Sequence, residues 1–182
     1  CDPKQAVAIA NKLSGENVFG VIGHMCSGSA IPASHTYNEE GILMISPSAT
    51  SPQLTEQHFD NIFRTCGRDD QQGAVVASYI AKKFVGKSIA IVHDKSSYGQ
   101  GLADVVKKDL NEKNIQEKLY ESILRGERDY SSLISKLKQN KIDVLFFGGY
   151  HTEAGLIVRQ MRDQGLTAVF ISDDDMTTKA FW

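Results

Sequence analysis

Two patterns of hydrophobic residues follow one another in turn along this chain, one typical of buried strands and one typical of amphipathic helices. Together they predict an α/β protein. The continuous apolar runs Ile89-Ala-Ile-Val92 and Val144-Leu-Phe-Phe147 are typical of strands that are covered on both faces. Between such runs, apolar residues recur at three- and four-residue steps, as at Leu102, Val106 and Leu110, which indicates amphipathic helices. A regular alternation of strand and helix predicts parallel sheets with right-handed crossovers.

The expected elements divide the chain into two parts. Helices are expected at 3–14, 28–38, 69–84, 99–113, 129–140 and 152–164, and strands at 18–22, 42–46, 61–65, 88–93, 117–122, 143–148 and 167–171. The alternation of strand and helix is interrupted between about residues 60 and 70, after a Ser/Thr/Pro-rich connector at 46–56. We therefore predict a partial first lobe at 1–66, a second lobe at 67–172, and a segment at 173–182 in which a further helix begins near Met176.

Composition narrows the class of partner. The 182 residues include 41% hydrophobic residues and carry a formal net charge of −2, with the lysines spread over the helical patterns. Nucleic acid and anionic membrane surfaces call for clustered Lys and Arg, so neither is expected as a partner. No apolar run approaches the ~20 residues that a membrane-spanning helix needs.

The beginning of the sequence reads as a helix start. Cys1 leads directly into Asp2 and Pro3, a capping residue followed by proline in the first turn. We interpret the chain as an internal piece of a longer protein. Its first lobe is two strand–helix units long and has little hydrophobic core of its own. We expect this lobe to be stabilised by packing against further sequence, against the second lobe or against another copy of the chain.

The cysteines leave several possibilities open. Cys1, Cys26 and Cys66 include no Cys-x-x-Cys pair, so a zinc site is not expected, and spacing alone cannot set a disulfide connectivity. An amino-terminal cysteine is also typical of a lipid anchor, although such anchors usually precede a flexible linker and here a helix begins at once.

Four predicted strands end in short polar or aromatic segments, at 24–29, 46–50, 93–99 and 148–153. In an open α/β sheet the carboxyl ends of neighbouring strands line one crevice, and ligands bind there. Tyr98 and Tyr150 come just before predicted helix starts. A tyrosine ring at such a position can cover a bound ligand while the tyrosine hydroxyl remains in contact with water. The alternative is that both rings pack on the sheet edge.

Ser27 opens a predicted helix, so free backbone N–H groups and a positive dipole end surround its hydroxyl. This setting favours a carboxylate ligand, although a plain N-cap serine would also explain the residue.

Catalytic interpretations find little support. Cys26 and His24 are two residues apart on an extended segment, so their side chains point to opposite faces. Neither a Gly-x-Ser-x-Gly elbow nor the glycine fingerprints of dinucleotide and phosphate loops occur. We expect no enzyme activity and no cofactor.

The run Asp173-Asp174-Asp175 is the one acidic cluster at a predicted strand end. It is compatible with Mg²⁺ in a phosphatase or receiver-like site, with a ligand ammonium, or with the cap of the helix expected near Met176.

Taken together, the segments resemble one family over nearly the whole chain. Matching segments follow in order at 1–6, 21–27, 41–47, 91–95 with Tyr98-Gly99, and 148–151. They resemble the bacterial periplasmic leucine/isoleucine/valine-binding proteins of the type I periplasmic-binding fold. That resemblance implies two Rossmann-like lobes, with parallel sheets flanked by helices, that close on one amino acid.

The resemblance also implies roles for individual residues. The ligand carboxylate would be held by Ser27 and Thr50, and the ammonium by the backbone carbonyl of Ser48 and the carboxylate of Asp174. Pocket-wall positions match Met25, Cys26, Tyr98 and Tyr150, and the family pairs the cysteines that match Cys1 and Cys26.

Two departures bear on specificity. The family usually has Glu within a Gly-Pro-Glu-Gly stretch where this chain has 172–175, and Ser48 replaces a common alanine. The implied function is a periplasmic solute-binding component that delivers an aliphatic L-amino acid to the permease of an ABC transporter. The alternatives are a receptor ligand-binding domain of the same fold and, far behind, a Mg²⁺-dependent phosphatase or receiver.

Overall fold

The computed structural model describes residues 1–181, and these divide into two compact units, Cys1–Gln71 and the part of the chain from Gln72 onward. Trp182, the last residue of the predicted 173–182 segment, lies outside the described residues. The predicted lobe boundaries at residues 66 and 172 stay predictions. No helix in the described range is long and apolar enough to cross a membrane.

Helices and strands alternate along both units. The helices are α1 Pro3–Ser14, α2 Ser27–Glu39, α3 Asp69–Lys83, α4 Gly99–Glu112, α5 Ser131–Gln139 and α6 His151–Asp163, with short 3₁₀ helices η1 Pro52–Leu54 and η2 Asp174–Thr177. The strands are β1 Gly20–Ile22, β2 Leu43–Ser46, β3 Ile62–Arg64, β4 Ile89–His93, β5 Leu119–Ser122, β6 Val144–Gly148 and β7 Val169–Ile171.

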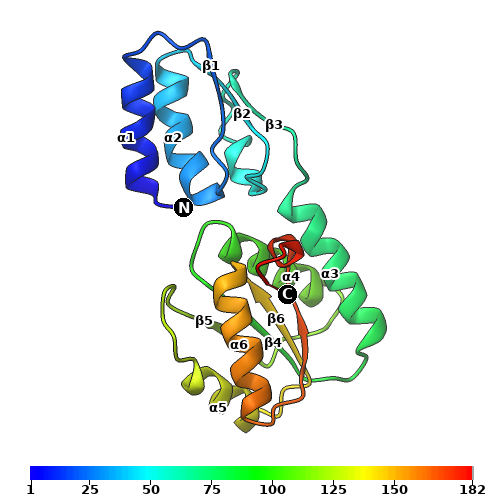
Figure 1. Cartoon of the computed structure of the whole chain (residues 1–182). Helices are drawn as coiled ribbons and strands as arrows, with labels where there is room; N and C mark the ends of the chain where they lie inside the picture. The colour runs from blue at the N-terminus through cyan, green and yellow to red at the C-terminus, as the bar shows by residue number, and fades with distance from the viewer. Residues whose placement is uncertain (182) are drawn as a thin grey trace. The chain divides into compact units, whose positions relative to one another are not determined.

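The first unit is a three-stranded parallel sheet in the order β1-β2-β3 with helices on one face. Helices α1 and α2 run side by side along that face (Figure 1). The register aligns Val21 with Met44 and Met44 with Ile62. These residues pack with Tyr37 and Leu54 into the core of the unit.

The opposite face of this sheet carries an apolar row. Ile22 aligns with Ile45, and Ile45 with Phe63. Ile22 is 76% exposed and Phe63 is 48% exposed. An uncovered apolar face is unusual for a parallel sheet. The self-association expected for a chain with an incomplete first lobe stays a prediction.

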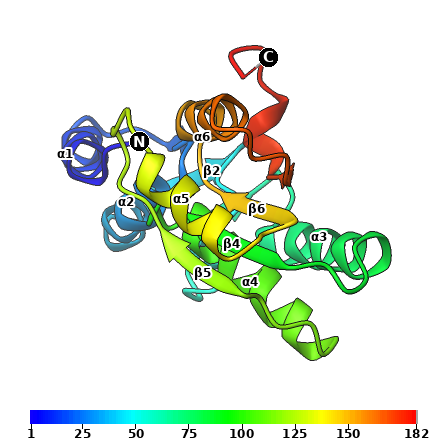
Figure 2. The same ribbon diagram turned by 90° about the horizontal axis from the view of Figure 1, so that it is seen from below.

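The second unit is a four-stranded parallel sheet in the order β5-β4-β6-β7, covered on both faces. Figure 2 shows α5 and α6 on one side of the sheet and α3 and α4 on the other. Alternate residues of β6 serve the two cores: Leu145 and Phe147 pack against α5 and α6, while Val144 and Phe146 pack against α3 and α4. This explains why these strands are apolar at every position.

Local sequence accounts for two helix starts. The Asp2 carboxylate accepts the Gln5 N–H at 3.0 Å and caps α1, with proline next in the chain, as the sequence predicts. At the start of α4, the backbones of Gly99 and Gly148 approach so closely that a Cβ on Gly99 would lie 2.4 Å from the Gly148 carbonyl oxygen. Only glycine permits this approach.

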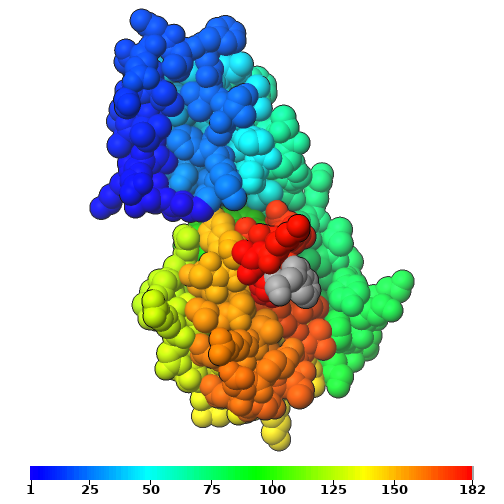
Figure 3. Space-filling model, in the orientation of Figure 1, coloured from blue at the N-terminus to red at the C-terminus, as the bar shows by residue number. Residues whose placement is uncertain are grey.

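The structure corrects two expectations. The helix expected to begin near Met176 is instead the single 3₁₀ turn Asp174–Thr177, which ends because Thr178 is extended. It lies against α6, and Figure 3 shows this red segment beside the orange atoms of α6. The strand expected at 18–22 pairs only from Gly20 onward, because Gly20 is the first residue in register with β2.

Candidate functional site

In the first unit, the carboxyl ends of β1 and β2 are joined by side chains. Ser46 at the end of β2 donates a hydrogen bond from its hydroxyl to the His24 carbonyl oxygen at 2.7 Å. The His24 ring lies 3.1 Å from the Tyr37 hydroxyl on α2, and burial lowers the pKa of His24. This partly buried network fixes the turn that leads into α2.

Ser27 is the first residue of α2, and Cys26 occupies the N-cap position. The interpretation of Ser27 as a plain N-cap serine is therefore wrong. The Ser27 hydroxyl is buried and accepts the Ser51 N–H at 3.2 Å, which joins the helix start to the segment after β2. The first amides of a helix generally have no partner within the helix, although here the Ser29 N–H donates to the Cys26 carbonyl oxygen at 2.9 Å.

The other predicted residues of this unit differ in exposure. Thr50, next to Ser51, is buried, and its carbonyl oxygen accepts the Asp69 N–H at 3.1 Å. Ser48 is exposed and Met25 is 67% exposed. The structure thus brings Ser27 and the 50–51 segment together, while Ser48 and Met25 reach the surface.

A disulfide joins Cys1 to Cys26, with 5.5 Å between the two Cα atoms. This is the pairing that the family resemblance implies. It ties the start of α1 to the residue that caps α2, so the turn carrying Ser27 is held covalently as well as by hydrogen bonds.

In the second unit, two tyrosines from different strand ends come together. Tyr98 immediately precedes α4 and Tyr150 immediately precedes α6, as the sequence predicts. Their ring centroids lie 5.4 Å apart at an angle of 39°. Tyr98 is buried and Tyr150 is partly buried.

The three consecutive aspartates have three different sets of partners. Asp173 is buried and accepts the Gly149 N–H at 2.9 Å and the Asp175 N–H at 3.2 Å. It thereby caps the 3₁₀ turn and ties the end of β7 to the end of β6. Burial raises the pKa of Asp173 to about 8, against the opposing effect of the Gly149 N–H.

Asp174 is exposed, and its Oδ1 accepts two hydrogen bonds. The Tyr98 hydroxyl donates one at 2.6 Å and the Gln72 amide donates the other at 2.9 Å. The Asp175 carboxylate accepts the His151 N–H at the start of α6 and lies 2.7 Å from His151 Nδ1. Asp174 thus lies against the tyrosine pair, and a hydrogen bond from Tyr98 also acts on Asp173, where it lowers the pKa against the larger effect of burial.

No group of three His, Cys, Asp or Glu side chains within residues 1–181 is arranged to hold a metal ion. In the acidic run the carboxylates accept hydrogen bonds from protein groups, Asp173 from the Gly149 N–H, Asp174 from the Tyr98 hydroxyl and Asp175 from the His151 N–H.

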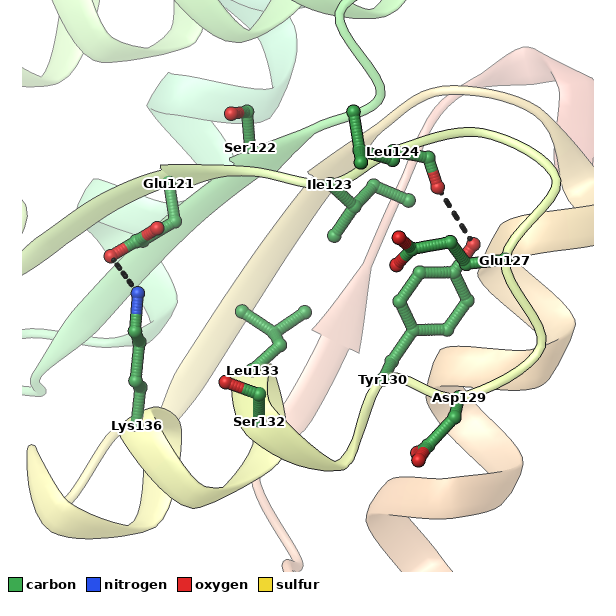
Figure 4. A pocket seen from close by; sticks show the side chains of 10 residues that line it. All are labelled: Glu121, Ser122, Ile123, Leu124, Glu127, Asp129, Tyr130, Ser132, Leu133 and Lys136. Atoms are coloured by element: carbon green, nitrogen blue, oxygen red, sulfur yellow. Dashed lines mark hydrogen bonds and ion pairs between the residues drawn. The ribbon is translucent and has the colours of Figure 1, made fainter.

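A separate pocket of about 180 Å³ lies between β5 and α5 of the second unit (Figure 4). The ion pair between Glu121 and Lys136, at 2.7 Å, closes one end of it, and the Tyr130 hydroxyl donates to the Leu124 carbonyl oxygen at the other. None of the predicted binding residues lines this pocket.

Both units are therefore parallel α/β structures that gather hydroxyl, aromatic or acidic groups at the carboxyl ends of their strands. This arrangement defines a protein of the open α/β class, in which ligands bind at the carboxyl ends of the strands. The chain belongs to the periplasmic binding protein family, whose model matches residues 1–175. The resemblance and the fold class predicted from the sequence are confirmed.

The curated relatives include proteins named Leu/Ile/Val-binding protein homologs and a protein named amino acid binding protein. The chain is 58% identical over 97% of its length to Leu/Ile/Val-binding protein homolog 1 of Brucella melitensis, and 51% identical over 98% to an amino acid binding protein of Pseudomonas aeruginosa. It covers 48% of each of these proteins, so it spans about half the length of the curated relatives it matches.

Solved structures agree with this family. The leucine binding protein LivK of Thermotoga maritima is 26% identical with a TM-score of 0.87, over 96% of this chain and 50% of that one. LivJ of Streptococcus pneumoniae, solved with isoleucine, is 26% identical with a TM-score of 0.84, over the same shares.

Sequence reasoning missed three residues that the structure places beside the tyrosine pair. Gln72 bonds to Asp174, Arg125 lies over the Tyr150 ring, and Asp94 faces Arg125. Asp94 directly follows β4 and lies within the polar segment 93–99 predicted at that strand end, but no role was predicted for it. Gln72 and Arg125 carry no such local signal, because their partners lie far along the chain.

Proposed function

We propose that the protein containing this chain is the periplasmic solute-binding component of an ABC transporter. It captures one aliphatic L-amino acid, of the leucine, isoleucine and valine class, between two lobes and delivers it to the membrane permease. It performs no chemistry on the ligand and needs no cofactor. The names of the relatives, which span both transport components and amino acid binding proteins, support this assignment.

One observation carries the proposal. In the second unit the Tyr98 hydroxyl donates to Asp174, and the Tyr98 ring packs against Tyr150, so a carboxylate sits beside an aromatic wall. An α-amino acid with an apolar side chain needs this pair of features, a charged partner for its ammonium and an apolar surface for its side chain. Both hydrogen bonds to Asp174 fall on Oδ1, which leaves Oδ2 for the ligand ammonium.

The first unit carries the groups that would bind the carboxylate of the ligand. In this proposal the buried Ser27 hydroxyl, the first amides of α2 and Thr50 bind the carboxylate. The backbone carbonyl of the exposed Ser48 accepts a hydrogen bond from the ammonium, and Met25 forms part of the pocket wall. A helix start supplies N–H groups and a positive dipole end for an anion. Cys26, held by the disulfide, forms part of the pocket wall.

The test is binding of L-leucine, L-isoleucine and L-valine, measured by calorimetry and thermal shift. Because the chain spans half of its relatives, it is assayed both as the 182-residue chain and as a chimera that replaces the matching half of the Brucella protein. A ligand at a hundred times its dissociation constant adds about 2.7 kcal/mol of stability, which a melting curve resolves.

Variants of the chimera locate the site. Ser27→Ala and Thr50→Ala are each expected to weaken binding by about 1–3 kcal/mol, the cost of losing a hydrogen bond to a charged group. Ser135→Ala, which removes an exposed hydroxyl from α5, is the matched control and leaves affinity unchanged. Unchanged affinity in both site variants would exclude this carboxylate site.

A further inference from the structure

Arg125, in the loop after β5, contacts two residues that follow other strands of the second unit, Tyr150 and Asp94. Its guanidinium carbon lies 4.6 Å from the centroid of the Tyr150 ring. Its Nε lies 3.7 Å from Oδ2 of Asp94, whose side chain is fully buried, while that of Arg125 is 40% exposed. A planar guanidinium can stack on an aromatic face and pair with a carboxylate at the same time, which an ammonium does less well.

Asp94 supplies a reason for a cation at this place. Its Oδ1 accepts both the N–H and the hydroxyl of Ser96, at 2.9 and 2.6 Å. Its Oδ2 is buried and receives no hydrogen bond from the described residues, so the Arg125 guanidinium is the charge that compensates it. A buried carboxylate without compensation is costly, which favours the bound position of Arg125.

The loop that carries Arg125 is anchored on both sides. The Leu124 carbonyl oxygen accepts the Tyr130 hydroxyl at 3.2 Å, and the Gly126 N–H donates to the buried Glu153 carboxylate at 3.0 Å. Gly126 has a φ of +81°, a conformation that side chains disfavour. These contacts hold the backbone on both sides of Arg125, which favours the position of its side chain beside Tyr150 and Asp94.

We propose that Arg125 is a positioning residue that clamps the Tyr150 ring against Tyr98 and so sets the shape of the aromatic wall. The tyrosine pair is otherwise fixed mainly through Tyr98, whose hydroxyl bonds to Asp174. Tyr150 has the partly exposed ring, and Arg125 restrains it by stacking. The consequence for ligand affinity rests on the proposed function, whereas the clamp itself does not.

The clamp is tested first without ligand, by near-ultraviolet circular dichroism, which reports the coupling of the two tyrosine rings. Arg125→Ala is expected to weaken the tyrosine signal while leaving the far-ultraviolet spectrum unchanged, and Arg125→Lys to restore it in part. Arg128→Ala, which removes an exposed arginine from the same loop, is the control and leaves the signal unchanged. An unchanged spectrum in Arg125→Ala, or an equal change in the Arg128 control, would overturn the proposal.

Binding of L-leucine to the chimera then tests the consequence. Arg125→Ala is expected to weaken binding about two- to fivefold, as for a cation–π contact at a partly exposed site. In a Tyr150→Ala background the same change is expected to have no further effect, because Arg125 acts through that ring. Equal losses in both backgrounds would refute action through Tyr150. If the unsubstituted chimera binds none of the three amino acids, the proposed function fails, and the ligand-free spectra still decide the clamp.

Discussion

Asp173 makes the stability of the second unit depend on pH, and the direction follows from its surroundings. Asp173 is 7% exposed, and burial raises the pKa of its carboxyl group from 3.8 to about 8. Because the folded protein holds this proton more tightly than the unfolded chain, the contribution of Asp173 to stability is fully present below pH ~4 and is lost as the pH rises through about 8.

The magnitude follows from the two pKa values. They differ by about 4 units, and one unit corresponds to about 1.4 kcal/mol, so complete ionisation costs on the order of 5–6 kcal/mol. In the middle of the window, the free energy of unfolding should fall by up to ~1.4 kcal/mol for each unit of pH. Burial raises the pKa of Asp94 as well, which adds a slope of the same sign.

Asp173→Asn isolates the contribution of this residue. The asparagine stays neutral and its carbonyl oxygen can still accept the Gly149 N–H, so the variant should lose the Asp173 part of the slope. Asp163→Asn removes an exposed carboxylate from α6 and is the control. The assay is urea unfolding between about pH 5 and pH 9, followed by far-ultraviolet circular dichroism. If the Asp173→Asn variant and the unsubstituted protein have equal slopes, the assignment of this proton to Asp173 is refuted.

Two further predictions concern backbone fit and covalent restraint. Gly99→Ala should lower the free energy of unfolding by about 1–3 kcal/mol, because the new Cβ would lie 2.4 Å from the Gly148 carbonyl oxygen. Gly101→Ala on the same helix meets open space and should raise the free energy of unfolding by about 0.5–1 kcal/mol. The urea midpoints of the two variants should therefore move in opposite directions. Replacing both Cys1 and Cys26 by serine should lower the free energy of unfolding by about 3 kcal/mol, since the disulfide joins residues that are 25 positions apart. The melting temperature of this double variant should be lower than that of the unsubstituted protein and should not change when a reductant is added. An equal melting temperature in the two proteins would contradict this prediction.

The helices, the strands and the parallel α/β class could be predicted from the sequence, because period and burial are linked locally. The runs at Ile89 and Val144 are apolar at every position because each strand is covered on both faces. Tyr98 and Tyr150 could be placed at helix starts for the same reason, since the strand-to-helix transition is visible in the local pattern.

The partners of polar side chains were decided only by the tertiary structure. The run 173–175 reads as one acidic cluster, yet its members bond to Gly149, Tyr98 and His151, up to 76 residues away. Arg125 had no signal of its own, because its role depends on a tyrosine and a buried carboxylate from two other strand ends. Periodicity encodes which face of an element is buried, but partnerships across a sheet arise only when packing brings distant strand ends together.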